Sequence, residues 1–268
     1  MIINKKYNIS NSYHKRIILI SDIHFCNKKI VPLLYELLDN IKELKPDYLC
    51  ITGDLVDDKN IKDKEYLLDW IKDLSKICKI LISIGNHELY FNHNIEESFD
   101  KELFDQIDRI KNVYVLNNKI RSEYGINFIG VTLPGDYYDL GEQENDLIYF
   151  MNKKFSKLDK GYNIMLLHSP YHITKKEVLN ELKCNKKLNL ILSGHMHAGL
   201  TFEWLKKYLK GRGLITPQRT FFTKYCYGLY SVNDTKVIIS SGITKLAKSH
   251  IFGLFNKLYK SEIITIDL

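Results

Sequence analysis

The chain has 268 residues, of which 45% are hydrophobic and 26% are charged, and its formal net charge is +7. This composition is that of a folded globular protein with a sizeable core, and it excludes a disordered, collagen-like or coiled-coil chain. Segment 1–16 is polar and lacks the apolar stretch of a signal peptide, and no apolar run reaches the roughly 20 residues that a membrane helix needs. We therefore expect a cytoplasmic protein, whose basic charge favours an acidic partner such as a phosphate ester, a nucleic acid or an anionic membrane surface.

The first part of the chain alternates between short apolar runs and segments with apolar residues at helical spacing. Buried strands are expected over 16–20, 48–52 and 79–84, and amphipathic helices over 31–44 and 61–77. Because strand–helix–strand alternation builds right-handed crossover units, this part of the chain predicts a parallel sheet.

The rest of the chain is richer in strands. Helices are expected over 94–110 and 142–155, a hairpin over 119–131, and strands over 113–116, 163–167, 188–192, 227–232, 235–240 and 262–267. No repeat and no linker divides the chain. We therefore predict one α/β domain, residues 1–268, with two packed sheets of mixed direction and helices outside them.

Side chains that can bind metal follow five of these predicted strands: Asp22 and His24; Asp54; Asn86; His168; and His195 and His197. Each motif alone has an ordinary structural explanation, such as a Gly-Asn turn or a buried, hydrogen-bonded histidine. Open α/β sheets, however, place their ligands beyond the carboxyl ends of the strands. Five such segments in one chain therefore predict a single site.

The predicted ligands are chemically suited to more than one metal ion. Seven nitrogen and oxygen ligands exceed what one ion needs, and a carboxylate can bridge two ions. Two cations roughly 3.5–4 Å apart can clamp both sides of a phosphoryl centre and activate a water molecule. Imidazole and carboxylate ligands without thiolate suit Mn, Fe, Co or Zn, and the sequence does not choose among these metals.

These motifs resemble, in order, those of the calcineurin-like metallophosphoesterase superfamily: Asp22-x-His24, Gly53-Asp54, Gly85-Asn86-His87-Glu88, His168 and Gly194-His195-x-His197. The resemblance covers essentially the whole chain and implies a four-layer αββα sandwich. Segments 21–24, 53–57 and 261–263 are most similar to the bacterial branch of membrane-associated phosphohydrolases. That branch usually begins with a membrane segment, which we do not expect in this sequence, and it usually has Gly-Gly-Gln where this chain has Ala198-Gly199-Leu200.

The resemblance also implies a role for each residue of the motifs. Asp22, His24 and His197 would bind the first metal; Asn86, His168 and His195 would bind the second; Asp54 would bridge the two. His87 would contact the phosphate and protonate the leaving oxygen. Glu88 and Asp57 are expected to orient ligands rather than to bind metal.

The function that follows is hydrolysis of a phosphodiester or pyrophosphate bond in a lipid-linked or nucleotide substrate. A nuclease is one alternative, favoured only by the basic charge, because the chain lacks a second DNA-binding module or a regular stacking platform. A non-catalytic scaffold with the same fold is another alternative. The complete ligand set and His87 argue against it.

Segment 199–225 follows the last of these histidines and carries six basic residues against one acid, Glu203. We expect a helix with Phe202, Leu205 and Leu209 on one face, and with Lys206, Lys207 and Lys210 pointing away from it. One interpretation is a helix packed on the core with a solvated basic face. The other, which the basic and apolar stretch 245–260 favours, is a lid that docks on anionic lipid at the inner face of the membrane.

Overall fold

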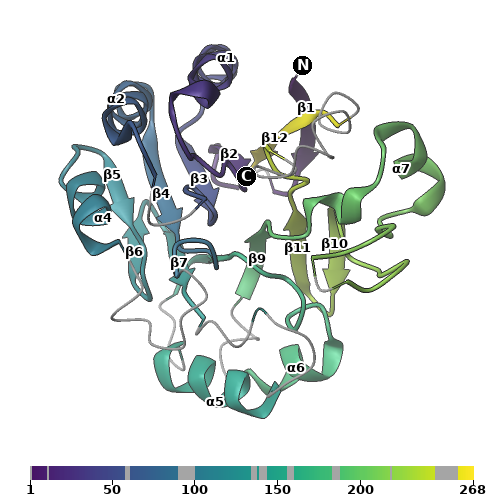
Figure 1. Cartoon of the computed structure of the whole chain (residues 1–268). Helices are drawn as coiled ribbons and strands as arrows, with labels where there is room; N and C mark the ends of the chain where they lie inside the picture. Colours follow the sequence, from purple (N-terminus) through teal and green to yellow (C-terminus); the bar gives the residue numbers. More distant parts are fainter. Residues whose placement is uncertain are drawn as a thin grey trace.

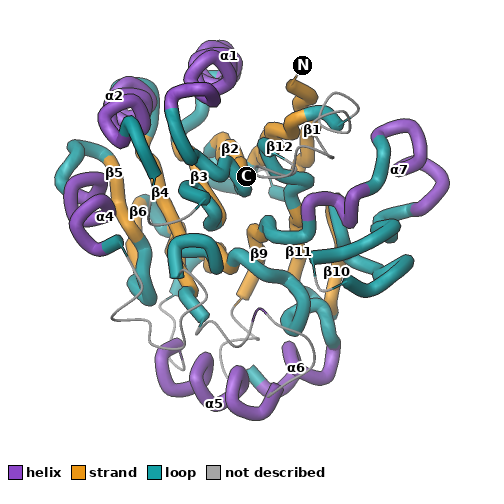
Figure 2. Tube along the Cα trace, viewed as in Figure 1, coloured by secondary structure: helices purple, strands orange, loops and turns teal. Residues whose placement is uncertain are grey.

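The computed structural model describes residues 2–10, 12–57, 61–89, 100–133, 138, 144–155, 160–182, 188–217, 219–244 and 259–268. In these residues, two six-stranded sheets pack against each other, and helices cover their outer faces (Figures 1 and 2). This is the predicted sandwich of two mixed sheets flanked by helices.

The first sheet has the order β1-β12-β2-β3-β4-β5. Its strands are β1 (Ile2–Asn8), β12 (Ser261–Asp267), β2 (Arg16–Ile20), β3 (Tyr48–Thr52), β4 (Lys79–Ser83) and β5 (Val113–Val115). Strands β2 to β5 are mutually parallel, and β12 runs antiparallel to β2. Helices α1 (Val31–Leu44), α2 (Lys64–Ser75) and α4 (Lys101–Asp108) lie over this sheet (Figure 1).

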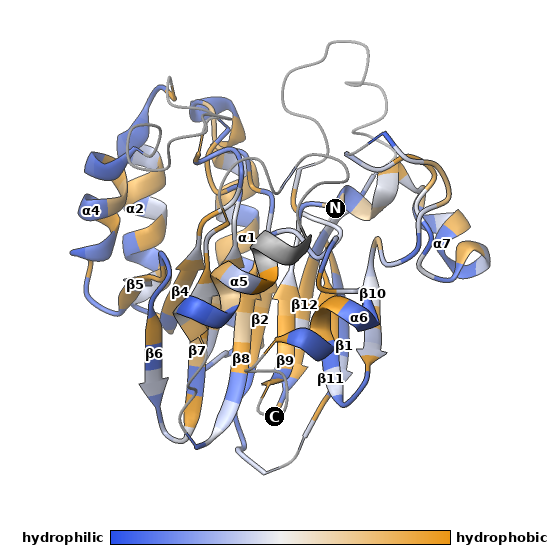
Figure 3. Cartoon of the chain, turned by 90° about the horizontal axis from the view of Figure 1, so that it is seen from below, coloured by the Kyte–Doolittle hydropathy of each residue, from blue (hydrophilic) through white to orange (hydrophobic). Residues whose placement is uncertain are grey.

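The second sheet has the order β10-β11-β9-β8-β7-β6. Its strands are β10 (Gly228–Val232), β11 (Thr235–Ile239), β9 (Leu188–Ser193), β8 (Tyr162–Leu167), β7 (Ile126–Val131) and β6 (Ile120–Glu123). Helices α5 (Glu144–Phe155) and α6 (Lys176–Glu181) cross in front of β8 and β9, and α7 (Glu203–Leu209) lies to one side near β10 (Figure 3). Two short 3₁₀ helices, Lys28–Ile30 and His197–Leu200, complete the regular structure of the described residues.

Alternation along the strands builds the layers. In β2, Ile17 and Leu19 pack between the two sheets, whereas Ile18 and Ile20 pack toward the helices, and all four are fully buried. Because both faces are covered, the central strands are continuous apolar runs (Figure 3). The same parallel strands all end at one edge of their sheet, which is where the polar loops begin.

The structure differs from the sequence predictions in several elements. Strand β1 was not predicted, because residues 2–8 are mostly polar; it is an edge strand whose partner, β12, lies at the other end of the chain. Helix α6 was also missed. Helix α4 begins after its N-cap residue Asp100, and the part of the predicted helix over 94–99 lies outside the described residues, as does 245–258 of the predicted lid.

Candidate metal centre

The predicted ligands lie in the loops that follow five strands. Asp22 and His24 follow β2, Asp54 follows β3, and Asn86 follows β4. His168 comes directly after β8, and His195 and His197 come after β9. The loops after β2 and β3 hold each other, because the Asp22 and His24 amides donate hydrogen bonds to the Gly53 and Asp54 carbonyls over 3.2 and 2.9 Å.

Five of these seven residues have a left-handed backbone. Their φ angles are +54° at Asp22, +50° at His24, +50° at Asp54, +65° at His195 and +46° at His197. Such conformations cost roughly 1–3 kcal/mol each in residues other than glycine, and they persist only where surrounding contacts enforce them. The clustering of this strain on the predicted ligands marks the loops as a built site.

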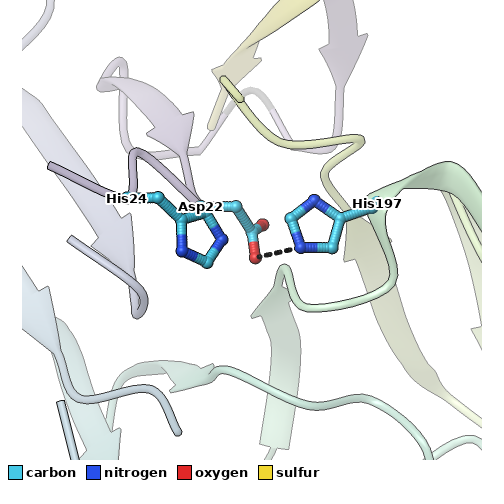
Figure 4. Close-up of side chains that lie close together, drawn as sticks. All are labelled: Asp22, His24 and His197. Atoms are coloured by element: carbon cyan, nitrogen blue, oxygen red, sulfur yellow. Dashed lines mark ion pairs between the residues drawn. The ribbon is translucent and has the colours of Figure 1, made fainter. Parts of the chain in front are cut away.

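The first group of converging side chains is Asp22, His24 and His197 (Figure 4). One ligand atom from each lies within 4.8 Å of the other two. His197 Nε2 is 3.7 Å from Asp22 Oδ1, and the rings of His24 and His197 stack with centroids 5.3 Å apart. Asp22 is fully buried, and its carboxylate also accepts a hydrogen bond from the His195 amide over 3.1 Å.

The second group is Asp54, His168 and His195, whose ligand atoms also lie within 4.8 Å of one another. His168 Nε2 is 3.1 Å from Asp54 Oδ2 and 3.1 Å from Asn86 Oδ1. Asn86 is therefore beside this group, as expected.

Asp54 connects the two groups. Its Oδ2 atom lies 3.1 Å from His168 Nε2 in the second group and 3.7 Å from His24 Nε2 in the first. It also lies 4.0 Å from Nε2 of His87, a half-buried ring that packs edge-on against His24. A single carboxylate oxygen thus faces imidazoles from both groups, which is the arrangement that a bridging ligand needs.

Backbone carbonyls orient three of the imidazoles. His168 Nδ1 is 2.7 Å from the Thr52 carbonyl, His197 Nδ1 is 3.2 Å from the Thr244 carbonyl, and His87 Nδ1 is 2.7 Å from the Asp57 carbonyl. A ring whose Nδ1–H donates to a carbonyl presents Nε2 to the site, which is the usual arrangement of a metal-binding histidine.

Glu88 is buried, and its hydrogen bonds connect the loop after β3 with the loop after β4. Its carboxylate accepts hydrogen bonds from the amides of Asp54, Val56 and Gly85 over 3.0, 3.0 and 2.6 Å. A Cβ atom at Gly85 would lie 2.3 Å from Asp54 Oδ1, so only glycine fits here. These contacts match the orienting role that the sequence suggested for Glu88.

Asp57 lies between two histidines and forms a third cluster with them. Its Oδ1 atom is 3.5 Å from Nδ1 of both His24 and His87. The sequence suggested that Asp57 orients ligands. This position fits that role, because the Asp57 carboxylate lies beside both His24, a residue of the first group, and His87, the expected acid.

The charges of the site are strongly coupled. Burial acts to raise the pKa of Asp54, but the imidazoles of His168 and His87 outweigh it and hold that pKa well below its usual value. Burial lowers the pKa of His168, yet Asp54 raises it to a net value of about 9. Burial and the neighbouring His168 lower the pKa of His195 to about 3. Metal binding would therefore release the His168 proton, because a ligating histidine is neutral.

The donor set fits divalent cations. Two buried carboxylates and four imidazoles, with the Asn86 amide beside them, point into a small volume without a thiolate. Burial and the charge of Asp54 both act to raise the pKa of Asp22, but the imidazoles of His197 and His168 outweigh them and hold that pKa below its usual value; the two carboxylates therefore still oppose each other's ionisation. Positive charge between them relieves this repulsion, and nitrogen and oxygen donors of this kind suit Mn, Fe, Co or Zn.

Three contributors to the site were not predicted from the sequence. Thr52 and Thr244 act through backbone carbonyls, which any residue could supply. Tyr138, 4% exposed, packs against the rings of His168 and His195, with centroids 6.0 and 5.6 Å away. Tyr138 does not follow a predicted strand, whereas the other site residues were identified because they come directly after one.

Two packed sheets, with Asp and His side chains that converge beyond the strand ends, define an α/β protein with a candidate metal centre. The family model described as calcineurin-like phosphoesterase matches residues 15–199, and the chain belongs to this family. The resemblance predicted from the motifs is therefore confirmed.

Relatives carry names of the same kind. The chain is 27% identical over 230 residues to an uncharacterized metallophosphoesterase of Campylobacter jejuni. The alignment covers 85% of this chain and 53% of that protein. It is 28% identical over 229 residues to one of Helicobacter pylori, with 85% and 54% covered. A probable cyclic nucleotide phosphodiesterase of Synechococcus is 23% identical over 193 residues, with 66% and 65% covered. The chain thus spans about half the length of the first two relatives.

Proposed function

We propose that this protein hydrolyses a phosphodiester or pyrophosphate bond with two divalent metal ions. The observation that carries the proposal is the position of Asp54 Oδ2, which faces an imidazole of each ligand group. Asp22, His24 and His197 would hold the first ion, Asn86, His168 and His195 would hold the second, and Asp54 would be shared by both. When bound, such ions polarise phosphoryl oxygens and lower the pKa of a coordinated water molecule.

In this proposal His87 is the catalytic acid. Its ring is the more accessible part of the site, with 27% of the side chain exposed, so it can contact a substrate. Nδ1 is held by the Asp57 carbonyl at 2.7 Å, which leaves Nε2 to face the site and donate a proton to the leaving oxygen. The Asp57 carboxylate also lies close to the ring, with Oδ1 3.5 Å from His87 Nδ1.

The proposed substrate is lipid-linked, and the proposed location is peripheral, on the inner face of the membrane. No helix among the described residues is both long enough and apolar enough to span a bilayer. Support comes from segment 204–222, which carries five of the eleven exposed large hydrophobic side chains in the described chain: Trp204, Tyr208, Ile215, Phe221 and Phe222. Five exposed basic residues accompany them: Lys207, Lys210, Arg212, Arg219 and Lys224. Aromatic and basic side chains together suit an anionic membrane interface.

The structure corrects one part of this expectation. Lys206 was predicted to point away from the apolar face of the helix with Lys207 and Lys210, but it is buried and lies 2.7 Å from Glu203. Glu203, the single acid of segment 199–225, is thus paired with the buried Lys206. The exposed basic residues of the segment therefore have no carboxylate of the same segment left to pair with.

Vesicle sedimentation tests the membrane part of the proposal. We expect binding to anionic vesicles at low salt, weaker binding at high salt, and none to neutral vesicles. Changing Trp204 and Phe221 to Ser should abolish binding, whereas changing Tyr149, equally exposed on α5, should not. No binding to anionic vesicles at low salt, with unchanged activity of the Trp204→Ser/Phe221→Ser variant, would leave a soluble substrate as the better assignment.

A substrate panel tests the chemistry. Purified protein with added Mn should cleave a nitrophenyl diester and a nucleoside diphosphate-lipid faster than a nitrophenyl monoester. The cyclic nucleotide phosphodiesterase name of the Synechococcus relative keeps nucleotide diesters in the panel as a second candidate. Preference for the monoester would contradict the diester assignment, cleavage of single-stranded DNA would support a nuclease, and no cleavage of any substrate would support a scaffold.

A further inference from the structure

Glu262, at the start of β12, is a buried carboxylate outside the metal centre. It is 1% exposed. Its Oε1 accepts a hydrogen bond from the Ser241 amide over 2.9 Å, and its Oε2 accepts one from the Ser241 hydroxyl over 3.1 Å. Lys5 Nζ from β1 lies 2.5 Å from Oε2. A buried charge with this many partners is costly to assemble, so its position calls for a functional explanation.

Helix α7 joins the same network through Lys206. Lys206 Nζ donates a hydrogen bond to Ser241 Oγ over 2.9 Å and lies 3.9 Å from Glu262 Oε2. The hydroxyl of Tyr227 donates to the Lys206 carbonyl over 3.0 Å, which fixes the helix where the lysine enters the protein. The buried face of α7 is thus tied to Ser241 and Glu262.

Ser241 begins a loop that touches the first ligand group directly. The Ile243 and Thr244 amides donate hydrogen bonds to the carbonyls of Ser21 and Asp22, each over 2.9 Å. The Thr244 hydroxyl also donates to the Asp22 carbonyl, and the Thr244 carbonyl lies 3.2 Å from His197 Nδ1.

Gly242 shows how closely this loop approaches the site. Its φ is +83°, and a Cβ there would meet Asp22 Cβ at 3.0 Å. The Glu262 amide donates to the Gly242 carbonyl over 3.2 Å, so β12 holds the loop by its backbone as well as by its side chain. The loop contacts two of the three residues of the first group, Asp22 and His197.

We propose that Glu262, with Ser241 and Lys206, is a positioning unit for the Asp22–His24–His197 half of the metal centre. The carboxylate fixes Ser241, and the loop 241–244 in turn fixes the Asp22 backbone and the His197 ring. The second group has its own supports, the Thr52 carbonyl and Glu88, and neither belongs to this network. The inference rests on the proposed function only for the identity of the ligands.

The consequence is selective. Residues that orient metal ligands typically change metal affinity by about 10–100-fold when they are replaced. Glu262→Ala should therefore weaken one of two bound ions by that factor and leave the other unchanged. Glu262→Gln, which still accepts the Ser241 amide but lacks the charge, should fall between the wild type and Glu262→Ala.

Calorimetric titration of the metal-free full chain with Mn²⁺ measures both affinities without any turnover. Glu123→Ala is the matched control, because Glu123 is also a largely buried carboxylate, bonded to Lys79 and Arg121, on the edge strand β6. It should lower thermal stability without changing either affinity. If Glu262→Ala does not fold, Ser241→Ala and Lys206→Met test the same connection.

The outcomes separate the two claims. A wild type that does not bind two ions contradicts the proposed function, whatever the variants do. A wild type that binds two ions, with variants that bind both as tightly, overturns the positioning role of Glu262. Equal weakening of both ions also overturns it, because the network contacts one group only.

Discussion

The two halves of the candidate metal centre are supported in different ways. Asp54, His168 and His195 are anchored by neighbours within the family-matched region, such as the Thr52 carbonyl and the Glu88 carboxylate. Asp22 and His197 depend on the loop 241–244, which lies outside residues 15–199. One half is therefore held from within residues 15–199, whereas the other is also held by residues beyond them.

Asp54 tests whether the halves act as one site, and its loss should have the largest effect. A metal ion supplies several kcal/mol of transition-state stabilisation, so Asp54→Asn should reduce kcat by roughly 10³-fold or more. Steady-state kinetics on the best diester substrate measure the effect, with circular dichroism as the check on folding. Turnover within tenfold of wild type would mean that Asp54 does not join the halves.

His87 lies beside both halves and belongs to neither. His87→Ala should keep its metal ions and lose about 10²–10⁴-fold in kcat, the typical contribution of general acid catalysis. The loss should be smaller for nitrophenyl leaving groups, which need little protonation, than for alkyl ones. An equal loss across leaving groups would point to charge stabilisation rather than proton transfer.

Single-ligand variants should distinguish the halves. Asn86→Ala should weaken the ion of the second group, and His197→Ala should weaken that of the first, each with the other ion retained. Metal analysis after dialysis against a graded series of chelator concentrations would show one equivalent lost in each case. Loss of both ions together in both variants would show that the halves cannot be occupied separately.

The network of Glu262, Ser241 and Lys206 that supports the first half should also have a small effect on stability at acidic pH. Burial acts to raise the pKa of Glu262, but Lys5 and Lys206 outweigh it, so the pKa lies below its ordinary value of 4.5. Its stabilisation is then complete above pH 4.5 and is lost as the pH falls through the lowered pKa. Urea unfolding of Glu262→Gln should show a flatter decline of stability below that pH than the wild type. Parallel curves would exclude this linkage.

Short-range signals predicted much of the fold and the proposed ligands. Apolar runs such as 16–20 and 48–52 form strands that are buried on both faces. The proposed ligands come directly after such strands, so the end of each strand determines where they lie. Partners distant in the sequence were not predictable. Strand β1 pairs with residues more than 250 positions away. Lys206 turns inward because its ammonium group contacts Ser241 and Glu262, which are distant in the sequence. Helical periodicity places a lysine on a polar face but cannot reveal a buried carboxylate supplied by another strand.

The bridging role of Asp54 is the central claim, and electron paramagnetic resonance of the Mn²⁺-loaded protein tests it most directly. Two Mn²⁺ ions joined by one carboxylate, roughly 3.5–4 Å apart, are magnetically coupled. At two equivalents of Mn²⁺ we predict the spectrum of a coupled pair, which Asp54→Asn should abolish. The six-line spectrum of isolated Mn²⁺ at two bound equivalents in the wild type would contradict the account.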